Sequence, residues 1–220
     1  MSSPLKTMIE VALRDGWAVG TSTVDEVQRQ AQALKLIEAP IRKGAPPVST
    51  LRPKDRTTAI PKSLSAIYGK GAQPLHTDGA HLADPPDLLV LLNERPSGTP
   101  TLLWRKAAFS KLPFAAPDYM RHGVFLIRNG RDSFFSTAWE NSKFRYDPGC
   151  MEPADARARQ TVRYFEETAP EWVNEHYWEN PGTCLVINNQ RVLHARAAAT
   201  NDPERELKRI SFNLRKGAAA

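Results

Sequence analysis

Gln73-Pro-Leu-His-Thr-Asp-Gly-Ala-His81 is the stretch on which the interpretation of this chain depends. His76 and Asp78 are two residues apart, so on an extended backbone both side chains leave the same face. An imidazole and a carboxylate that face one space are suited to a divalent transition metal. A solvated turn would explain an isolated His-x-Asp pair as simply, so the metal hypothesis depends on the other residues that the chain supplies.

The composition is typical of a globular protein. With 220 residues, 41% of them hydrophobic and 25% charged, the chain can bury a sizeable core. We predict a single domain over residues 1–220, in which residues 1–60 form an N-terminal helix and an irregular scaffold segment. The net charge of +6 suits an anionic small molecule or nucleic acid. Because the basic residues are scattered, with no arginine-rich block, nucleic acid is not the expected partner.

Targeting signals and cysteine motifs are both missing from the sequence. The first residues, Met1 to Lys6, lack the apolar core of a signal peptide, and no apolar run approaches the ~20 residues that a membrane span needs. We therefore expect a cytoplasmic protein without membrane contact. Cys150 and Cys184 have no CxxC spacing, which predicts reduced thiols rather than a disulfide or a zinc site.

Two helices are predicted from capping and periodicity. Thr23-Val-Asp-Glu26 is a capping box followed by an apolar stripe, which predicts a helix over residues 24–35. Pro153 at the first helical position, with Asp155 in the first turn, predicts a second helix that ends before Pro170. The proline-rich stretch 41–61 is expected to be irregular.

Strands dominate the remainder of the chain. Asp87–Asn93 is a continuous apolar run typical of a strand buried on both faces. Thr101–Trp104 follows a Ser-Gly-Thr-Pro turn and is expected to pair beside it. Further strands are expected at residues 123–127, 182–187 and 209–214, and the aromatic segment 131–150 could cover a pocket. The pattern favours a mainly β fold with flanking helices, either a β-barrel or a two-sheet jelly roll.

His194 supplies the second histidine that a metal site around the His-x-Asp pair would need. It follows a buried strand in Asn188-Asn-Gln-Arg-Val-Leu-His194. Two histidines and one carboxylate make the facial triad that holds non-heme Fe(II) and leaves coordination positions open. Zinc hydrolases also use two histidines and a carboxylate, so the triad alone does not determine the metal.

These residues fall into a longer pattern. The pattern consists of His76-Thr-Asp78, Gly98-Thr-Pro-Thr101-Leu, Asn189-Gln-Arg-Val-Leu-His194-Ala-Arg196, Asn201-Asp-Pro and Arg205-Glu-Leu-Lys-Arg209. Over roughly residues 60–215 it resembles the Fe(II)/2-oxoglutarate-dependent oxygenases of the taurine dioxygenase and clavaminate synthase-like family. The resemblance implies a double-stranded β-helix (jelly-roll) core, with Fe(II) as metal and 2-oxoglutarate and O2 as cosubstrates.

The resemblance also implies roles for individual residues. It makes His76, Asp78 and His194 the iron ligands, and it makes Arg205, assisted by Thr101, the anchor of the distal carboxylate of 2-oxoglutarate. Arginine suits this task because its planar fork binds a carboxylate through two N–H groups and stays protonated. In the family an arginine at a second position, which Arg209 occupies here, often meets the acidic group of the substrate. If Arg205 precedes the strand, Arg209 is expected to take over the cosubstrate.

Each residue also has a simpler explanation. The run that contains Arg205 and Arg209 reads as a solvated charged face, and Thr101 as an ordinary strand threonine. The joint order and spacing favour the functional interpretation. His81 is expected to form a hydrogen bond outside the ligand set, and Arg196 to be structural.

Three hypotheses follow. The first is a dioxygenase that oxidises, most simply hydroxylates, a small acidic molecule with release of succinate and CO2. The alternative is a metal-dependent hydrolase or isomerase on a similar barrel, which would need a general base near the metal. The third is a nucleic-acid binder attracted by the positive charge. The chain is short for the resembled family, so a second copy in a homo-oligomer could help close the pocket.

Overall fold

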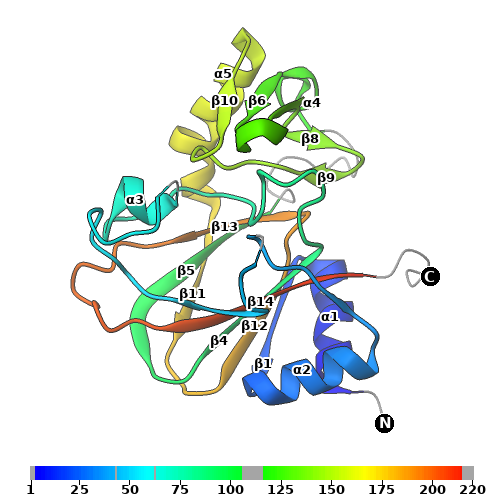
Figure 1. Cartoon of the computed structure of the whole chain (residues 1–220), viewed down its shortest axis with the longest axis vertical. Helices are drawn as coiled ribbons and strands as arrows, with labels where there is room; N and C mark the ends of the chain where they lie inside the picture. Colours follow the sequence, from blue (N-terminus) through cyan, green and yellow to red (C-terminus); the bar gives the residue numbers. More distant parts are fainter. Residues whose placement is uncertain (1–2, 43, 62, 106–115, 215–220) are drawn as a thin grey trace.

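The computed structural model describes residues 3–42, 44–61, 63–105 and 116–214, and its architecture is mainly β with flanking helices (Figure 1). This agrees with the fold class expected from the sequence. The helices and 3-10 or π turns are α1 (Pro4–Asp15), α2 (Val24–Ala33), α3 (Leu64–Tyr68), α4 (Asp118–His122), η2 (Gly130–Asp132), α5 (Ala156–Arg163), η3 (Tyr164–Thr168) and η4 (Ala169–Trp172). The strands are β1 (Trp17–Thr21), β2 (Ile37–Glu38), β3 (Val48–Leu51), β4 (Leu88–Asn93), β5 (Ser97–Arg105), β6 (Phe125–Ile127), β7 (Phe134–Ser136), β8 (Trp139–Glu140), β9 (Lys143–Phe144), β10 (Met151–Pro153), β11 (Asn174–Trp178), β12 (Thr183–Asn188), β13 (Val192–Arg196) and β14 (Leu207–Asn213).

The larger sheet has the order β1-β12-β4-β14-β2, with β3 also paired to β14, and its strands run antiparallel. Every residue of β4 is buried, as the apolar run predicts. Successive side chains leave opposite faces of a strand. Leu88, Val90 and Leu92 accordingly pack with α1 and α2, whereas Leu89 and Leu91 pack towards the second sheet.

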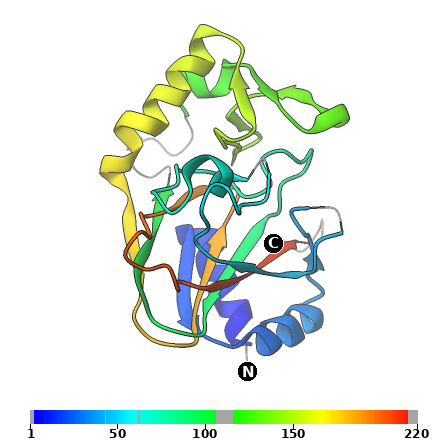
Figure 2. The ribbon, with the colours of Figure 1, turned by 60° about the vertical axis from the view of Figure 1, so that its left-hand side comes forward.

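The second sheet has the order β11-β5-β13 and lies against the larger one (Figure 2). Leu103, Trp178 and Val192 pack in the core between the two sheets. The expected pairing of Thr101–Trp104 with the strand at 87–93 is therefore wrong. The chain changes sheets after β4, and the expected turn at Ser97–Pro100 is part of β5 itself. Pro100 has no N–H to donate, and it lies where the β11 register shifts between His176 and Trp178.

A third layer covers the outer face of the small sheet. It contains α4, α5 and the β10-β6-β7 sheet, and its core includes Trp104 and Leu193 from β5 and β13 (Figure 1). The predicted strand at 123–127 is present as β6. The predicted second helix is present as α5, but its start is corrected: Asp155 is the N-cap and accepts from the N–H of Ala158 (2.7 Å), while Pro153 belongs to β10. The helical path does not end before Pro170, because η3 and η4 continue it.

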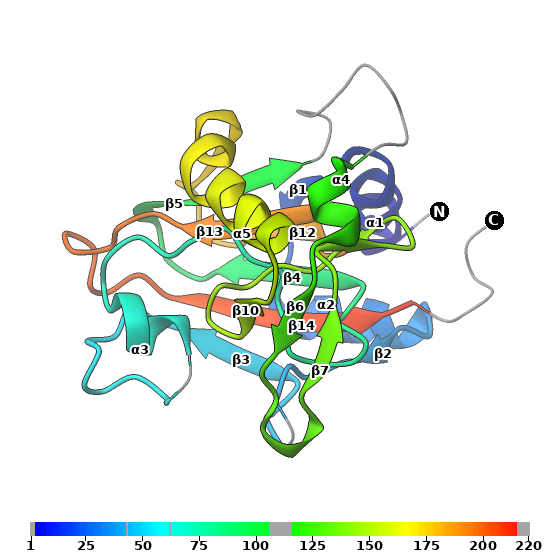
Figure 3. The ribbon, with the colours of Figure 1, turned by 90° about the horizontal axis from the view of Figure 1, so that it is seen from above.

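The N-terminal third combines a confirmed helix with unexpected elements. The side chain of Thr23 accepts from the N–H of Glu26 and caps α2, as the capping box predicts. Helix α1 and strand β1 were not expected, and the stretch 41–61 is not wholly irregular because it contains β3. Figure 3 shows β3 beside β14 at one edge of the larger sheet.

Two further expectations concern the cysteines and the membrane. Cys150 and Cys184 are both free thiols, and burial raises the pKa of Cys184 to about 12. Within the described part of the chain, no helix combines the length and the apolar character needed to cross a membrane.

Candidate active site

The three residues of the predicted triad lie together. One ligand atom from each of His76, Asp78 and His194 can be chosen so that all three atoms are within 4.8 Å of one another. The Nε2 atoms of His76 and His194 are 3.6 and 3.9 Å from Oδ1 of Asp78. The three residues are only 8%, 7% and 6% exposed. The predicted proximity is thus present in the fold.

A backbone bridge sets the relative position of the two imidazoles. The N–H of His76 donates to the carbonyl of His194 (2.9 Å), and the N–H of His194 donates back to that of His76 (3.0 Å). Side chains of directly opposed residues in an antiparallel pair leave the same face. The ring centroids are accordingly 4.4 Å apart, and both rings face Asp78.

The tautomer of His76 favours metal binding. Its Nδ1 lies 2.9 Å from the carbonyl oxygen of Pro74, which can only accept, so in the neutral ring Nδ1 carries the proton and Nε2 keeps its lone pair. Burial opposes a charge on this ring, but Asp78 raises the pKa of His76 above its usual value, so a metal would displace a proton shared with Asp78. For His194, burial and the neighbouring His76 lower the pKa to about 3. A neutral imidazole is the form that coordinates a metal.

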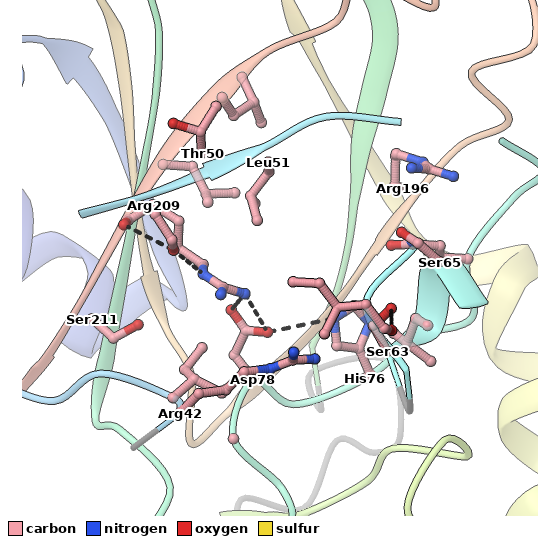
Figure 4. Close-up of a pocket in the computed structure, with 18 of the residues that line it drawn as sticks. Arg42, Thr50, Leu51, Ser63, Ser65, His76, Asp78, Arg196, Arg209 and Ser211 are labelled. Carbon is pink, nitrogen blue, oxygen red and sulfur yellow. Dashed lines mark hydrogen bonds and ion pairs between the residues drawn. The ribbon is translucent and has the colours of Figure 1, made fainter. Parts of the chain in front are cut away.

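Asp78 is held by its main chain and by its carboxylate. Asn189 accepts from the N–H of Asp78 (3.0 Å) and donates to its carbonyl (3.0 Å) and to that of Pro86 (2.9 Å). Nη1 of Arg209 lies 3.3 and 3.2 Å from the two carboxylate oxygens of Asp78 (Figure 4). Burial alone would raise the pKa of Asp78, but Arg209 and His76 hold it well below its usual range.

Arg205 is a buried cation whose hydrogen bonds go to neutral oxygens. Its Nε donates to the carbonyl of Thr99 (3.2 Å) and its Nη2 to Oγ1 of Thr101 (3.1 Å). It is 4% exposed, and burial together with Arg196 lowers its pKa to about 10. Among the described residues, no carboxylate forms an ion pair with it. Arg205 precedes β14, yet it is the arginine that contacts Thr101, while Arg209 contacts Asp78.

Thr101 is oriented by the strand beside it. Nε1 of the buried Trp178 on β11 donates to Oγ1 of Thr101 (3.1 Å), in addition to the bond from Arg205. The hydroxyl oxygen thus accepts two hydrogen bonds, and its own proton is left for an acceptor in the cavity.

The triad, Thr101, Arg205 and Arg209 all line one cavity of about 410 Å³. Much of the remaining lining comes from residues between 40 and 65, which include the stretch 41–61 that was expected to be irregular. Arg42, Ser63 and Ser65 are labelled among them in Figure 4. Of segment 131–150, which was expected to cover the pocket, Asp147 is the residue that lines it. Arg145 from the same segment donates to the carbonyls of Ala80 (2.6 Å) and Ala83 (2.7 Å), and so supports the loop that follows Asp78.

Two residues outside the triad, His81 and Arg196, also had predicted roles. His81 lies outside the triad and its Nε2 is 3.1 Å from the carbonyl oxygen of Ile41, as expected for a hydrogen-bonded residue. Arg196 donates to the carbonyls of Gly69 (2.8 Å) and Gly71 (2.7 Å), which fits the structural role expected of it, although it also borders the cavity.

No individual role was predicted for Asn189, Trp178 or Ser49. Asn189 lies in the motif before His194, but only the folded chain shows that it bonds to the Asp78 loop. Trp178 lies in a strand with no clear periodicity. Ser49 lies in a proline-rich stretch without a site signal, although it accepts from Nε of Arg209 (3.2 Å).

Comparison with known proteins relates part of this chain to a protein family. Residues 104–211 match the sequence model of the family described as taurine catabolism dioxygenase TauD, TfdA family. Over these residues the chain is similar to the TauD/TfdA family. None of the curated protein sequences compared with it is similar enough to count as a match.

Solved structures share the fold of this chain at low sequence identity. An asparagine oxygenase, solved with Fe(II), 3-hydroxyasparagine and succinate, is 16% identical with a TM-score of 0.68, over 96% of this chain and 80% of that one. The non-heme iron oxygenase OrfP, solved with Fe and alpha-ketoglutaric acid, is also 16% identical with a TM-score of 0.68, over 96% of this chain and 78% of that one. PvcB from Pseudomonas aeruginosa is 17% identical with a TM-score of 0.64, over 96% and 80% of the two chains. At these identities the likeness concerns the fold.

Proposed function

We propose that the chain is an Fe(II)/2-oxoglutarate-dependent dioxygenase that oxidises, most simply hydroxylates, a small molecule with release of succinate and CO2. The observation that carries the proposal is the pairing of two features in one cavity. One is a buried His-Asp-His set, and the other is a buried arginine that, among the described residues, has no carboxylate in ion-pair contact. A metal hydrolase needs the first feature and has no use for the second.

The donor set fits Fe(II). Two imidazole nitrogens and one carboxylate oxygen would hold the metal on one side and leave positions open on the other. In the TauD/TfdA family, the bound metal activates O2 for oxidation of 2-oxoglutarate and of the substrate. The protein's share is orientation and electrostatics: His76 presents Nε2, Asp78 supplies negative charge, and the Asn189 bonds fix the loop that carries it.

Arg205 and Thr101 suit the distal carboxylate of 2-oxoglutarate. A buried guanidinium gains most from an anion in a low-dielectric cavity, and the Thr101 hydroxyl adds a second donor directed by Trp178. The two groups would orient the cosubstrate so that its keto acid faces the triad. Arg209 is the alternative anchor, but its Nη1 is engaged by Asp78.

We further propose that the two facing sheets form a double-stranded β-helix core within a single domain. The asparagine oxygenase and OrfP structures support a substrate of the size of an amino acid, since a related fold encloses such molecules there. The arginines around the cavity favour one that carries an acidic group. Closure of the cavity by a second copy remains a prediction, which sizing by scattering can check.

The test is succinate formation when Fe(II), 2-oxoglutarate and O2 are added to the purified protein. We expect turnover of 2-oxoglutarate that increases in the presence of an accepted substrate and is lost in His76→Ala. A protein that binds neither Fe(II) nor 2-oxoglutarate would refute the proposal. Unchanged activity in Arg205→Ala would instead favour the hydrolase or isomerase alternative.

A further inference from the structure

One carboxylate at the centre of the site contacts both a guanidinium and an imidazole nitrogen. Both oxygens of Asp78 lie within 3.3 Å of Nη1 of Arg209, and Oδ1 also lies 3.6 Å from Nε2 of His76. A divalent cation held by His76, Asp78 and His194 would share this carboxylate with the guanidinium. Two cations that share one buried anion repel each other strongly, because little water screens them.

The guanidinium of Arg209 is fixed where it is. Its Nε donates to Oγ of Ser49 (3.2 Å), and Ser49 is its direct cross-strand partner in the β3–β14 pairing. The Arg209 side chain is 21% exposed and that of Asp78 is 9% exposed. Figure 4 shows the guanidinium directed at the Asp78 carboxylate. Strand β3 thereby keeps a positive charge beside the triad.

We propose that Arg209 is a positioning residue that lowers the affinity of the triad for divalent metal by sharing the charge of Asp78. This inference rests on the proposed function, because it requires the metal at His76, Asp78 and His194. It assigns Arg209 to the metal ligand and leaves the anchoring of 2-oxoglutarate to Arg205. A residue that only orients a ligand by hydrogen bonding has the opposite effect, since its loss typically weakens metal binding about 10–100-fold.

The test is a titration of the chelator-treated, full-length protein with Co(II), followed by calorimetry or by the visible absorption of the bound metal. We expect Arg209→Gln, which removes the charge and keeps an N–H donor, to bind Co(II) about tenfold more tightly than the wild type. Arg209→Lys keeps the charge, and its affinity is expected to remain within about threefold of the wild type. The matched control is Lys208→Gln, which removes the same charge from the next residue of β14, whose side chain pairs with Glu206 and contacts Thr50.

The outcomes separate the inference from the proposed function. Weaker or unchanged Co(II) binding by Arg209→Gln would overturn the inference, as would an equal gain in Lys208→Gln. If Arg209→Gln does not fold, as judged by circular dichroism, a change of more than tenfold in Arg209→Lys would overturn it and near-wild-type affinity would support it. Equal Co(II) binding by wild type and His76→Ala would instead refute the metal site on which the proposed function depends.

Discussion

Replacing Arg205 by methionine should separate binding from stability, because the two are expected to change in opposite directions. The side chain is buried and donates two hydrogen bonds to neutral oxygens, of Thr99 and Thr101. Its pKa is lowered from 12.5 to about 10, chiefly by burial. At about 1.4 kcal/mol per pKa unit, this corresponds to roughly 3 kcal/mol against the charged form in the folded protein. The guanidinium is protonated in both folded and unfolded chains at pH 7, so the whole cost is present there.

Methionine fills a similar volume without the charge. The gain of roughly 3 kcal/mol is offset by two lost hydrogen bonds at about 1 kcal/mol each, which leaves roughly 1 kcal/mol of added stability. For a chain of this size we expect a melting temperature about 2–4 °C higher. A carboxylate that loses a buried guanidinium partner loses about 3–4 kcal/mol, so 2-oxoglutarate binding should weaken about 10²–10³-fold.

The assay pairs thermal unfolding without ligand with calorimetric titration of 2-oxoglutarate in the presence of Co(II). Arg191→Met is the matched control, since Arg191 is an exposed arginine at the turn between β12 and β13. It should change neither quantity. A less stable Arg205→Met variant that binds 2-oxoglutarate as the wild type does would refute the reasoning, because Arg205 would then be a structural residue.

Three further substitutions test the hydrogen bonds that position the site residues and the N-cap of helix α5. Asn189→Ala removes the bonds to the main chain of Asp78 and should lower the free energy of unfolding by about 3 kcal/mol, measured by urea denaturation. Trp178→Phe keeps the ring but removes the donor to Thr101; it should cost about 1 kcal/mol of stability and weaken 2-oxoglutarate binding less than tenfold in a titration. Asp155→Ala removes the N-cap of α5 and should cost about 1 kcal/mol; because the pKa of Asp155 is lowered, this difference should shrink as the pH falls below about 4 in denaturation series.

Each of these has a control of the same residue type at an exposed position. Asn201→Ala, Trp172→Phe and Asp132→Ala should each change stability by less than about 0.5 kcal/mol. Equal losses in Asn189→Ala and Asn201→Ala would contradict the role given to the Asp78 loop. A full loss of 2-oxoglutarate binding in Trp178→Phe would show that Trp178 does more than orient Thr101. A constant effect of Asp155→Ala across pH would exclude the charged cap as its cause.

Local signals in the sequence predicted the elements that form by local interactions. The capping box at Thr23 predicted α2, and the unbroken apolar run after Asp87 predicted a strand buried on both faces. The start of α1 carries comparable signals, namely Pro4 at the first turn and apolar residues at Leu5 and Ile9, which are buried in the fold. Here the information was present in the sequence.

Long-range pairing could not be predicted in the same way. Strand β3 has four residues and is only partly buried, and its stability comes from pairing with β14, which lies far along the chain. Strand β5 was expected beside β4 because the two are consecutive, yet it lies in the other sheet. Neither result follows from periodicity, because period and composition do not specify which strands pair.

The candidate site shows the same difference between what local signals predict and what depends on long-range pairing. The order of His76, Asp78 and His194 along the chain predicted that they lie together, and they do; their role as iron ligands remains a prediction. The sequence left open which arginine reaches Thr101, because the answer depends on where β14 begins. The strand begins at Leu207, and Arg205 reaches Thr101 from the loop before it.

The hydrogen-bonded bridge between His76 and His194 has a consequence for the dynamics of the site. The two amide hydrogens lie in one pair of reciprocal bonds, so neither can exchange with solvent unless the local pairing opens for both. Their hydrogen–deuterium exchange should therefore be slow and matched, with rates that follow the detachment of the His76 segment from β13. The spacing between the two imidazoles would then persist for as long as this bridge stays closed.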